Sequence, residues 1–373
     1  MDKKSKAAFI PILLTIILAI PSLNVVQAVG LAQKITVGGA PIALAYDSET
    51  GEIFVTNAVS SAISVISDNT NTIVASIPIP ASTIAAAYDA GKGEIFASDA
   101  TISVISDSNN SIVANLAAGL EPVSLASDSG KSEIFVANFI SESISVISDV
   151  TNTVISTIPL EAKPQSLVYD SAKSEIFATT SGNATFSADS TLIISDVTNT
   201  VIANVTVGID PQGIVYDSGT NEVFVTNNGS NTVSVISDSS NTVVATIPVQ
   251  WSPTGVTYDS GENEIYAVND QSETISVISD STNTVIATVP LDAWSENAVY
   301  DSGNGEVFVT SGEYVSVISN SQAFATPSVS CSPNTVIQGQ TSTLTSATIT
   351  TGGLHHTRTS GSVKLLHLII HEN

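Results

Sequence analysis

Acidic side chains recur along this chain of 373 residues at nearly fixed intervals, and they are the groups best placed to do chemistry. The first set follows a Tyr or Ser, the second opens an apolar run, and the third ends a run that reads Ile-Ser-Asp. These sets are Asp47, Asp89, Asp128, Asp170, Asp217, Asp259 and Asp301; Glu52, Glu94, Glu133, Glu175, Glu222, Glu264 and Glu306; and Asp68, Asp107, Asp149, Asp196, Asp238 and Asp280, with Asn320 in the seventh place. They make up more than half of the 35 acidic residues.

Two interpretations of these carboxylates stay open. Calcium is a hard cation that takes six to eight oxygen ligands, so a ring of carboxylates is one way to bind it. In the other interpretation Asp caps a turn and Glu begins the next strand, and both recur because the fold recurs. Calcium is therefore the one cofactor that the sequence suggests as a candidate.

Catalysis is restricted by what the body of the chain lacks. Residues 29–324 contain no histidine and no cysteine. A histidine general base, Ser-His chemistry and a thiol nucleophile are therefore excluded from that range. Carboxylate or metal-assisted chemistry remains, such as a Ca²⁺-dependent lactonase or another propeller hydrolase or lyase with an axial carboxylate site. No set of residues singles itself out for it, so we expect a protein that is not an enzyme and has no catalytic residues.

The elements that carry these residues form a repeat. The Tyr/Ser-Asp steps are spaced 39 to 47 residues apart and occur seven times. A complete copy holds four short runs rich in Val, Ile, Thr and Phe, separated by Asp, Asn, Ser and Gly, which favour turns. A period of about 40 residues with four strands per unit is typical of a β-propeller, so the sequence predicts an all-β, seven-bladed propeller over residues 29–322.

The ends of the array predict how the ring closes. The seventh copy stops after its third run, while Gln33 to Gly39 supplies an extra run before the first copy. An open ring would leave a free strand edge, so the N-terminal strand is predicted to complete the last blade. Deletion of residues 31–39 should unfold or oligomerise the protein.

Several segments resemble a known repeat family. EIFVTN (52–57), EIFVAN (133–138), EVFVTN (222–227), the ISVISD and VSVISD runs and NTVVATIPV (241–249) resemble the YVTN family of β-propeller repeats, over about residues 33–320. That family is common in archaeal cell-surface and surface-layer proteins. The resemblance implies the fold strongly and a surface location, but no shared active site.

The variable positions predict a binding face. The turns between second and third strands share one face with the blade-to-blade connectors, and there the copies diverge. We expect ligand contacts from this face, and the two tryptophans, taken to stand at corresponding places in adjacent connectors, could form an aromatic wall or pack at a blade junction. The candidate residues are Trp251, Trp294, Glu161, Lys163, Asp210 and Glu296.

The first 28 residues predict export. Lys3, Lys4 and Lys6 precede an apolar run and Val26-Gln27-Ala28, the pattern of a cleaved signal peptide. No later stretch is apolar enough to span a membrane, and the net charge of −25 disfavours nucleic acid as a partner. We expect an extracellular, monomeric, non-catalytic binding, adhesion or envelope component whose partner is a protein or glycan.

Two further features concern modification and the C-terminus. Sequons that could accept glycans occur at Asn109, Asn183, Asn204 and Asn228. Residues 323–373 resemble the start of an immunoglobulin-like sandwich, but they are too few to complete one. They predict a truncated or disordered tail, and its four histidines are interpreted as solvated rather than as metal ligands.

Overall fold

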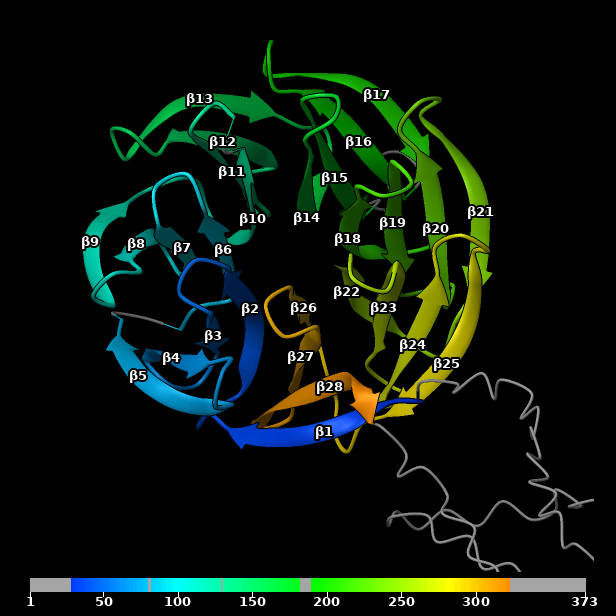
Figure 1. Ribbon diagram of the computed structural model, residues 1–373. Helices are drawn as coiled ribbons and strands as arrows, with labels where there is room; N and C mark the ends of the chain where they lie inside the picture. The colour runs from blue at the N-terminus through cyan, green and yellow to red at the C-terminus, as the bar shows by residue number, and fades with distance from the viewer. Residues whose placement is uncertain (1–27, 80–81, 129, 182–188, 323–373) are drawn as a thin grey trace, which may run out of the picture.

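The computed structural model describes residues 28–79, 82–128, 130–181 and 189–322. The predicted signal peptide, apart from its last residue, and the predicted C-terminal tail lie outside these ranges, as does the sequon at Asn183. No helix occurs among the described residues, which form seven antiparallel four-stranded sheets. In Figure 1 the sheets surround a common axis, which confirms the predicted seven-bladed β-propeller.

Each blade runs from an inner strand beside the axis to an outer strand on the circumference. Blades 1 to 3 are β2 (Pro41–Asp47), β3 (Glu52–Asn57), β4 (Ala62–Ser67) and β5 (Thr72–Pro78); β6 (Ala85–Asp89), β7 (Glu94–Ser98), β8 (Ile102–Ser106) and β9 (Ser111–Leu116); and β10 (Pro122–Asp128), β11 (Glu133–Asn138), β12 (Ser143–Ser148) and β13 (Thr153–Pro159). Blades 4 and 5 are β14 (Lys163–Asp170), β15 (Glu175–Ser181), β16 (Ser190–Ser195) and β17 (Thr200–Thr206); and β18 (Pro211–Asp217), β19 (Glu222–Asn227), β20 (Thr232–Ser237) and β21 (Thr242–Pro248). Blades 6 and 7 are β22 (Pro253–Asp259), β23 (Glu264–Asn269), β24 (Thr274–Ser279) and β25 (Thr284–Pro290); and β26 (Ala298–Asp301), β27 (Glu306–Ser311), β28 (Tyr314–Gln322) and β1 (Ala28–Thr36).

The core lies between neighbouring blades. The second and third strands of each blade are buried on both faces, which explains why their sequences are almost continuously apolar rather than alternating. Each second strand places one aromatic side chain in this layer, and all seven are buried: Phe54, Phe96, Phe135, Phe177, Phe224, Tyr266 and Phe308. Outer strands are exposed at alternate or successive positions because only one of their faces packs on the blade.

The predicted ring closure is confirmed. Strand β1 pairs antiparallel with β28, with Ile35 opposite Val315, so blade 7 combines both ends of the array. The strand begins at Ala28, earlier than the predicted start at Gln33. In Figure 1 β1 lies at the bottom of the ring, outside β28.

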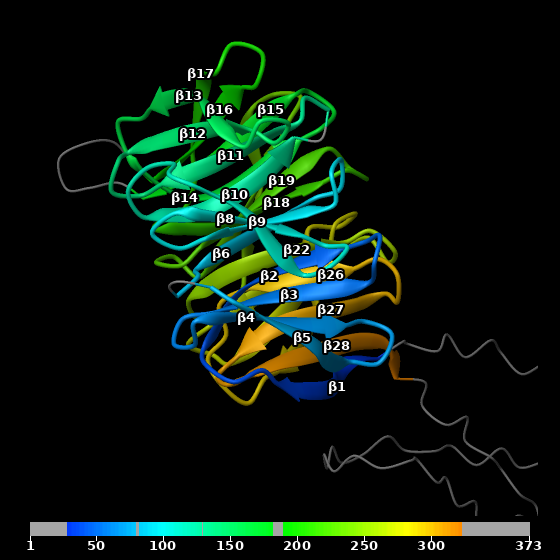
Figure 2. The ribbon, with the colours of Figure 1, turned by 90° about the vertical axis from the view of Figure 1, so that its left-hand side faces the viewer.

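The ring has two faces, which are distinguished by their turns. The acidic face carries the turns from first to second and from third to fourth strand, and the connector face carries the other turns and the connectors between blades. Figure 2 shows the ring from its side, with the nearest strands running between these two faces. Among the described residues no helix could cross a bilayer.

Candidate ligand-binding site in the axial cavity

Seven residues, one from each blade, surround the axis at the same position of the repeat. Each lies five residues before the Asp that ends its inner strand, close to the connector face. We call this set the axial ring: Ile42, Ile84, Val123, Gln165, Gln212, Thr254 and Glu296. It is apolar in blades 1 to 3 and polar in blades 4 to 7, although the strands that carry it are nearly the same in all copies.

The axial ring lines a cavity of about 520 Å³. The next residue of each inner strand adds small side chains or glycine: Ala43, Ala85, Ser124, Ser166, Gly213, Gly255 and Asn297. Asp270, in the turn that follows β23, completes the lining from the connector face. A concave site with apolar walls and a few convergent polar groups is the usual form of a ligand pocket.

Two carboxylates give one side of the cavity its charge. Glu296 and Asp270 are half-buried, and none of the described residues that line the cavity is a lysine or arginine. Burial raises the pKa of Glu296 above its usual range, and the negative charge of Asp270 adds to the rise. A group that donates hydrogen bonds or carries positive charge would relieve this repulsion.

Close contact between inner strands shapes the polar side. A Cβ on Gly213 would lie 2.3 Å from the backbone oxygen of Thr254, so only glycine lets the two strands approach this closely. The buried hydroxyl of Thr226 accepts a hydrogen bond from the Gly213 N–H (2.8 Å) and donates one to the Thr254 oxygen (2.5 Å). These contacts tie blade 5 to blade 6 directly beside the axial ring.

Amide side chains of the ring are held by their neighbours. The Nε2 of Gln212 donates to Oδ1 of Asp210 (2.9 Å), and the Nε2 of Gln165 donates to the Ser181 hydroxyl (3.0 Å). Asp210 was a candidate ligand contact on sequence grounds. Its carboxylate instead orients an amide that lines the cavity.

The two tryptophans do not occupy equivalent positions. The N–H of Gly312 donates to the Trp294 oxygen, whereas the equivalent N–H of Asp270 donates to the Ser252 oxygen. Trp294 is therefore equivalent to Ser252, one residue beyond the place of Trp251, so the expectation of corresponding places was wrong. Both indoles are on the connector face, with 66% of Trp251 and 43% of Trp294 exposed, and neither lines the cavity.

The remaining candidates lie on another connector. Glu161 is exposed between β13 and β14, and the Lys163 ammonium lies 4.6 Å from the centre of the Phe139 ring, a cation–π contact. Of the six candidates that the sequence suggested, Glu296 lines the cavity and Asp210 supports it. Trp251, Trp294 and Glu161 lie on the surrounding connectors, and Lys163 is the first residue of β14.

The described sequons differ in accessibility. Asn109 and Asn204 are exposed, although Oδ1 of Asn109 accepts a hydrogen bond from the Ser111 hydroxyl (2.6 Å). Asn228 is half-buried, and its amide nitrogen donates to the backbone oxygen of Pro253 (3.5 Å). Asn204, on the outer strand β17, is therefore the least engaged of the three.

On the acidic face, the repeated aspartates of the inner strands organise turns. Oδ1 of Asp47 accepts hydrogen bonds from the N–H groups of Glu49 (2.8 Å) and Thr50 (3.2 Å). Asp217 and Asp301 hold their turns in the same way. The turn-capping interpretation of this set is therefore confirmed.

Contacts between blades also explain the repeated tyrosines. The pKa of Tyr300 is raised to about 12 by burial and by the neighbouring carboxylate of Asp259 in the preceding blade. Tyr88 lies beside Asp47 in the same relation, and its pKa is also raised, mainly by burial. Each inner-strand tyrosine thus meets the turn aspartate of the blade before it.

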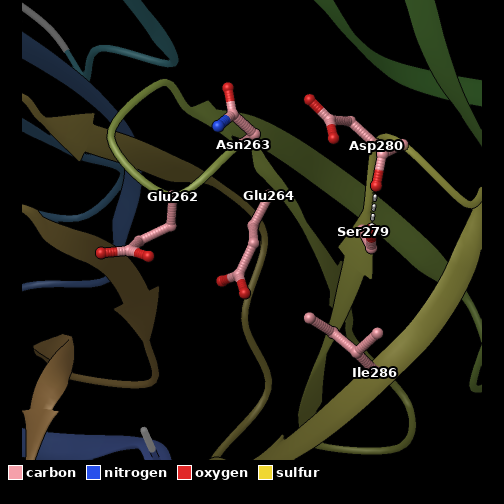
Figure 3. Close-up of a pocket in the computed structure, with 7 residues that line it drawn as sticks. Glu262, Asn263, Glu264, Ser279, Asp280 and Ile286 are labelled. Atoms are coloured by element: carbon pink, nitrogen blue, oxygen red, sulfur yellow. Dashed lines mark hydrogen bonds between the residues drawn. The ribbon is translucent and has the colours of Figure 1, made fainter.

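A second hollow, of about 280 Å³, lies on the acidic face at blade 6 (Figure 3). At three other junctions an Asn from the next blade's last turn reaches the repeated Glu, as Asn71 does when it donates to Glu306 (3.1 Å). Blade 7 has no such turn, because its fourth strand comes from the other end of the chain. In Figure 3 the carboxylates of Glu262, Glu264 and Asp280 point in different directions.

A calcium site built from three or more acidic residues is not found in the described part of the chain, where no such group of His, Cys, Asp or Glu is arranged to hold a metal ion. Asp270, Gln165 and Gln212 were not among the residues predicted from the sequence. The signal for the two glutamines was present, since aligning the seven copies at the inner-strand Asp shows one variable column five residues earlier.

Comparison with known proteins supports the fold. Among solved structures, the chain is similar to a chain of the Kuenenia stuttgartiensis hydrazine synthase, with a TM-score of 0.68 and 14% identity over 76% of this chain and 96% of that one. Likeness at this identity extends to the propeller fold alone. No family model matches the chain, and no curated protein does.

Proposed function

We propose that the protein is an exported cell-surface propeller of the YVTN type that binds a ligand in the axial cavity without transforming it. The axial ring carries this proposal. Positions that serve the scaffold repeat from blade to blade, as the buried aromatic residue and the turn Asp do. The ring varies from Ile42 to Glu296 within a conserved backbone frame, and it lines the larger of the two hollows described above.

The division of the ring indicates the class of ligand. An apolar arc from blades 1 to 3 faces an arc of amides, a hydroxyl and a carboxylate from blades 4 to 7. A sugar residue has an apolar face and a hydroxyl-bearing edge, and 520 Å³ leaves room for one or two such rings. The exposed indoles of Trp251 and Trp294 add stacking surface on the same face for the rest of a glycan.

A glycan and peptide array probed with the labelled full chain tests this function. We expect neutral or amino-sugar glycans to bind, and sulfated or carboxylated ones to be rejected by Glu296 and Asp270. Glu296→Gln should weaken that binding at least tenfold, and Trp251→Ala should weaken it less. Glu161→Gln, on the same face but outside the cavity, is the matched control.

Two outcomes would oppose the proposal. Glycan binding that Glu296→Gln leaves unchanged would place the ligand elsewhere, and a peptide bound in the cavity would replace the glycan as partner. Hydrolysis of a lactone that requires Ca²⁺ and is lost in Glu296→Gln would make the protein an enzyme instead.

A further inference from the structure

The junctions between neighbouring blades share one arrangement on the acidic face. The Asp that ends the inner strand of one blade faces the Asp that follows the third strand of the next blade. The two negative charges repel each other. Six such aspartate pairs occur: Asp47 with Asp107, Asp89 with Asp149, Asp128 with Asp196, Asp170 with Asp238, Asp217 with Asp280 and Asp301 with Asp68. In the seventh copy of the repeat, Asn320 stands at the position of the third-strand aspartate.

Three of the six pairs have a built-in cation. The third residue after the inner-strand Asp is lysine in blades 2, 3 and 4, and each lysine reaches the aspartate of the next blade. Lys131 Nζ lies 2.9 Å from Oδ1 of Asp196. Lys92 Nζ donates to the backbone oxygen of Asp149 at 2.5 Å while it forms its ion pair with Glu94 of its own blade (3.1 Å). Lys173 likewise donates to the backbone oxygen of Asp238.

In two more pairs, a threonine hydroxyl donates a hydrogen bond to the inner-strand aspartate. Threonine stands at this position in blades 1 and 5. The Thr50 hydroxyl donates to Oδ2 of Asp47 (2.6 Å), and the Thr220 hydroxyl donates to Oδ2 of Asp217 (2.7 Å). At both junctions the buried aspartate thus has hydrogen bonds to both of its oxygens.

The junction between blades 7 and 1 has neither a lysine nor a threonine at this position. Asp301 is fully buried, and its Oδ1 accepts from the N–H groups of Gly303 and Asn304. Its Oδ2 accepts no hydrogen bond. Asn304 stands where blades 1 to 5 have Lys or Thr, and Asp68 is the facing carboxylate.

One phenol proton is shared between these two carboxylates. The Tyr46 hydroxyl lies beside Asp301 and donates to Oδ2 of Asp68 (3.4 Å), so its single proton cannot bond both carboxylates at once. The three side chains also converge. A Cβ on Gly303 would lie 2.8 Å from Tyr46 Oη, 3.1 Å from Asp301 Oδ1 and 3.4 Å from Asp68 Oδ2.

The geometry points to a hard divalent cation, Ca²⁺ in an extracellular setting, bound between Asp301 and Asp68 at the junction where the first and last blades meet. Two carboxylates from different blades provide the charge, and the Tyr46 hydroxyl and water complete the oxygen shell. The ion does for this junction what the Lys131 ammonium does for Asp196 at the junction between blades 3 and 4. Few protein ligands predict weak binding, in the 10⁻⁴–10⁻³ M range typical of extracellular calcium modules.

Calcium titration of the thermal unfolding temperature tests the site. The full chain is treated with a chelator, dialysed and titrated with CaCl₂ at constant ionic strength. We expect a saturable rise with a midpoint of about 0.1–1 mM, and an approximately tenfold increase in the folding equilibrium constant at ten times the midpoint.

Three variants identify the site. Asn304→Lys supplies the missing ammonium, so the variant should melt higher without calcium and lose the calcium response. Asp68→Asn should also lose the response. Asp107→Asn removes the same charge from the same face at a junction that Thr50 relieves, and it should keep the response.

The proposal is overturned if 10 mM CaCl₂ leaves the unfolding temperature unchanged. It is also overturned if the wild type, Asp68→Asn and Asn304→Lys respond equally, because calcium would then bind the acidic face without a specific site. An equal response to NaCl at matched ionic strength would show charge screening instead.

Discussion

Replacing Asp149 with Asn should stabilise the protein at neutral pH. Asp149 faces Asp89 across the junction between blades 2 and 3, and both side chains are buried. Burial raises the pKa of Asp89 to about 6, and the contact with Asp149 adds to the rise. An Asn at position 149 removes one charge and can donate to Oδ2 of Asp89, which otherwise accepts no hydrogen bond.

The sign of the pH dependence follows from this shift. An aspartate with a folded pKa of about 6 binds its proton more tightly than in the unfolded chain, where the pKa is about 3.9. Its stabilising contribution is full below pH 4 and is lost as the pH rises through 6. The difference corresponds to the order of 2–3 kcal/mol between these limits.

The rest of the acidic face acts in the same direction. Burial and neighbouring carboxylates also raise the pKa of Asp128, Glu222 and Asp280. The wild-type unfolding temperature should therefore rise as the pH falls from 8 to 5. This is opposite to the behaviour of a protein held together by ion-paired carboxylates.

Differential scanning calorimetry from pH 4.5 to 8 measures both effects. Asp149→Asn should gain about 1–2 kcal/mol at pH 8, or roughly 2–6 °C, and the gain should shrink toward zero at pH 4.5. Glu161→Gln, exposed on the opposite face, should change little. The reasoning is refuted if Asp149→Asn is less stable than the wild type at pH 8, or if wild-type stability falls between pH 8 and 5.

The scaffold makes three further predictions, each measured by urea unfolding. Ile35→Ala, in the closing strand β1, should cost about 2–4 kcal/mol, whereas Val74→Ala on an outer strand should cost under about 0.5 kcal/mol; equal losses would contradict the closing role of β1. Gly213→Ala should destabilise by about 1–3 kcal/mol, because the added methyl group meets the backbone of blade 6, and a neutral result would show that the strands can separate. Thr226→Val should cost about 1–3 kcal/mol by leaving the Gly213 N–H without its acceptor, so a stabilised variant would refute the proposed tie between blades.

The fold could be predicted from the sequence because its causes are local and repeated. Every copy contains similar apolar strands and the same Asp-capped turn. The fourth run that the last copy lacks is supplied by the extra run at the start of the array. The early beginning of β1 at Ala28 was not visible, because its first residues pair beyond the part of the strand that resembles the other copies.

The candidate site was harder to predict because its residues are brought together by the ring and not by sequence proximity. Glu296 was found through the divergence of its connector, whereas Gln165 and Gln212 look like ordinary strand residues until the axis is known. The aspartate pairs were missed for a similar reason. The sequence places all the acids on one face, but only the ring shows that Asp301 of the last blade faces Asp68 of the first.

Isothermal titration of the full chain with the glycan that binds best on the array tests the central claim most directly. Saturable binding to the wild type, with at least tenfold weaker binding to Glu296→Gln and unchanged binding to Glu161→Gln, is the result predicted for a ligand in the axial cavity. Equal affinity for all three proteins, or no heat of binding at all, would contradict it.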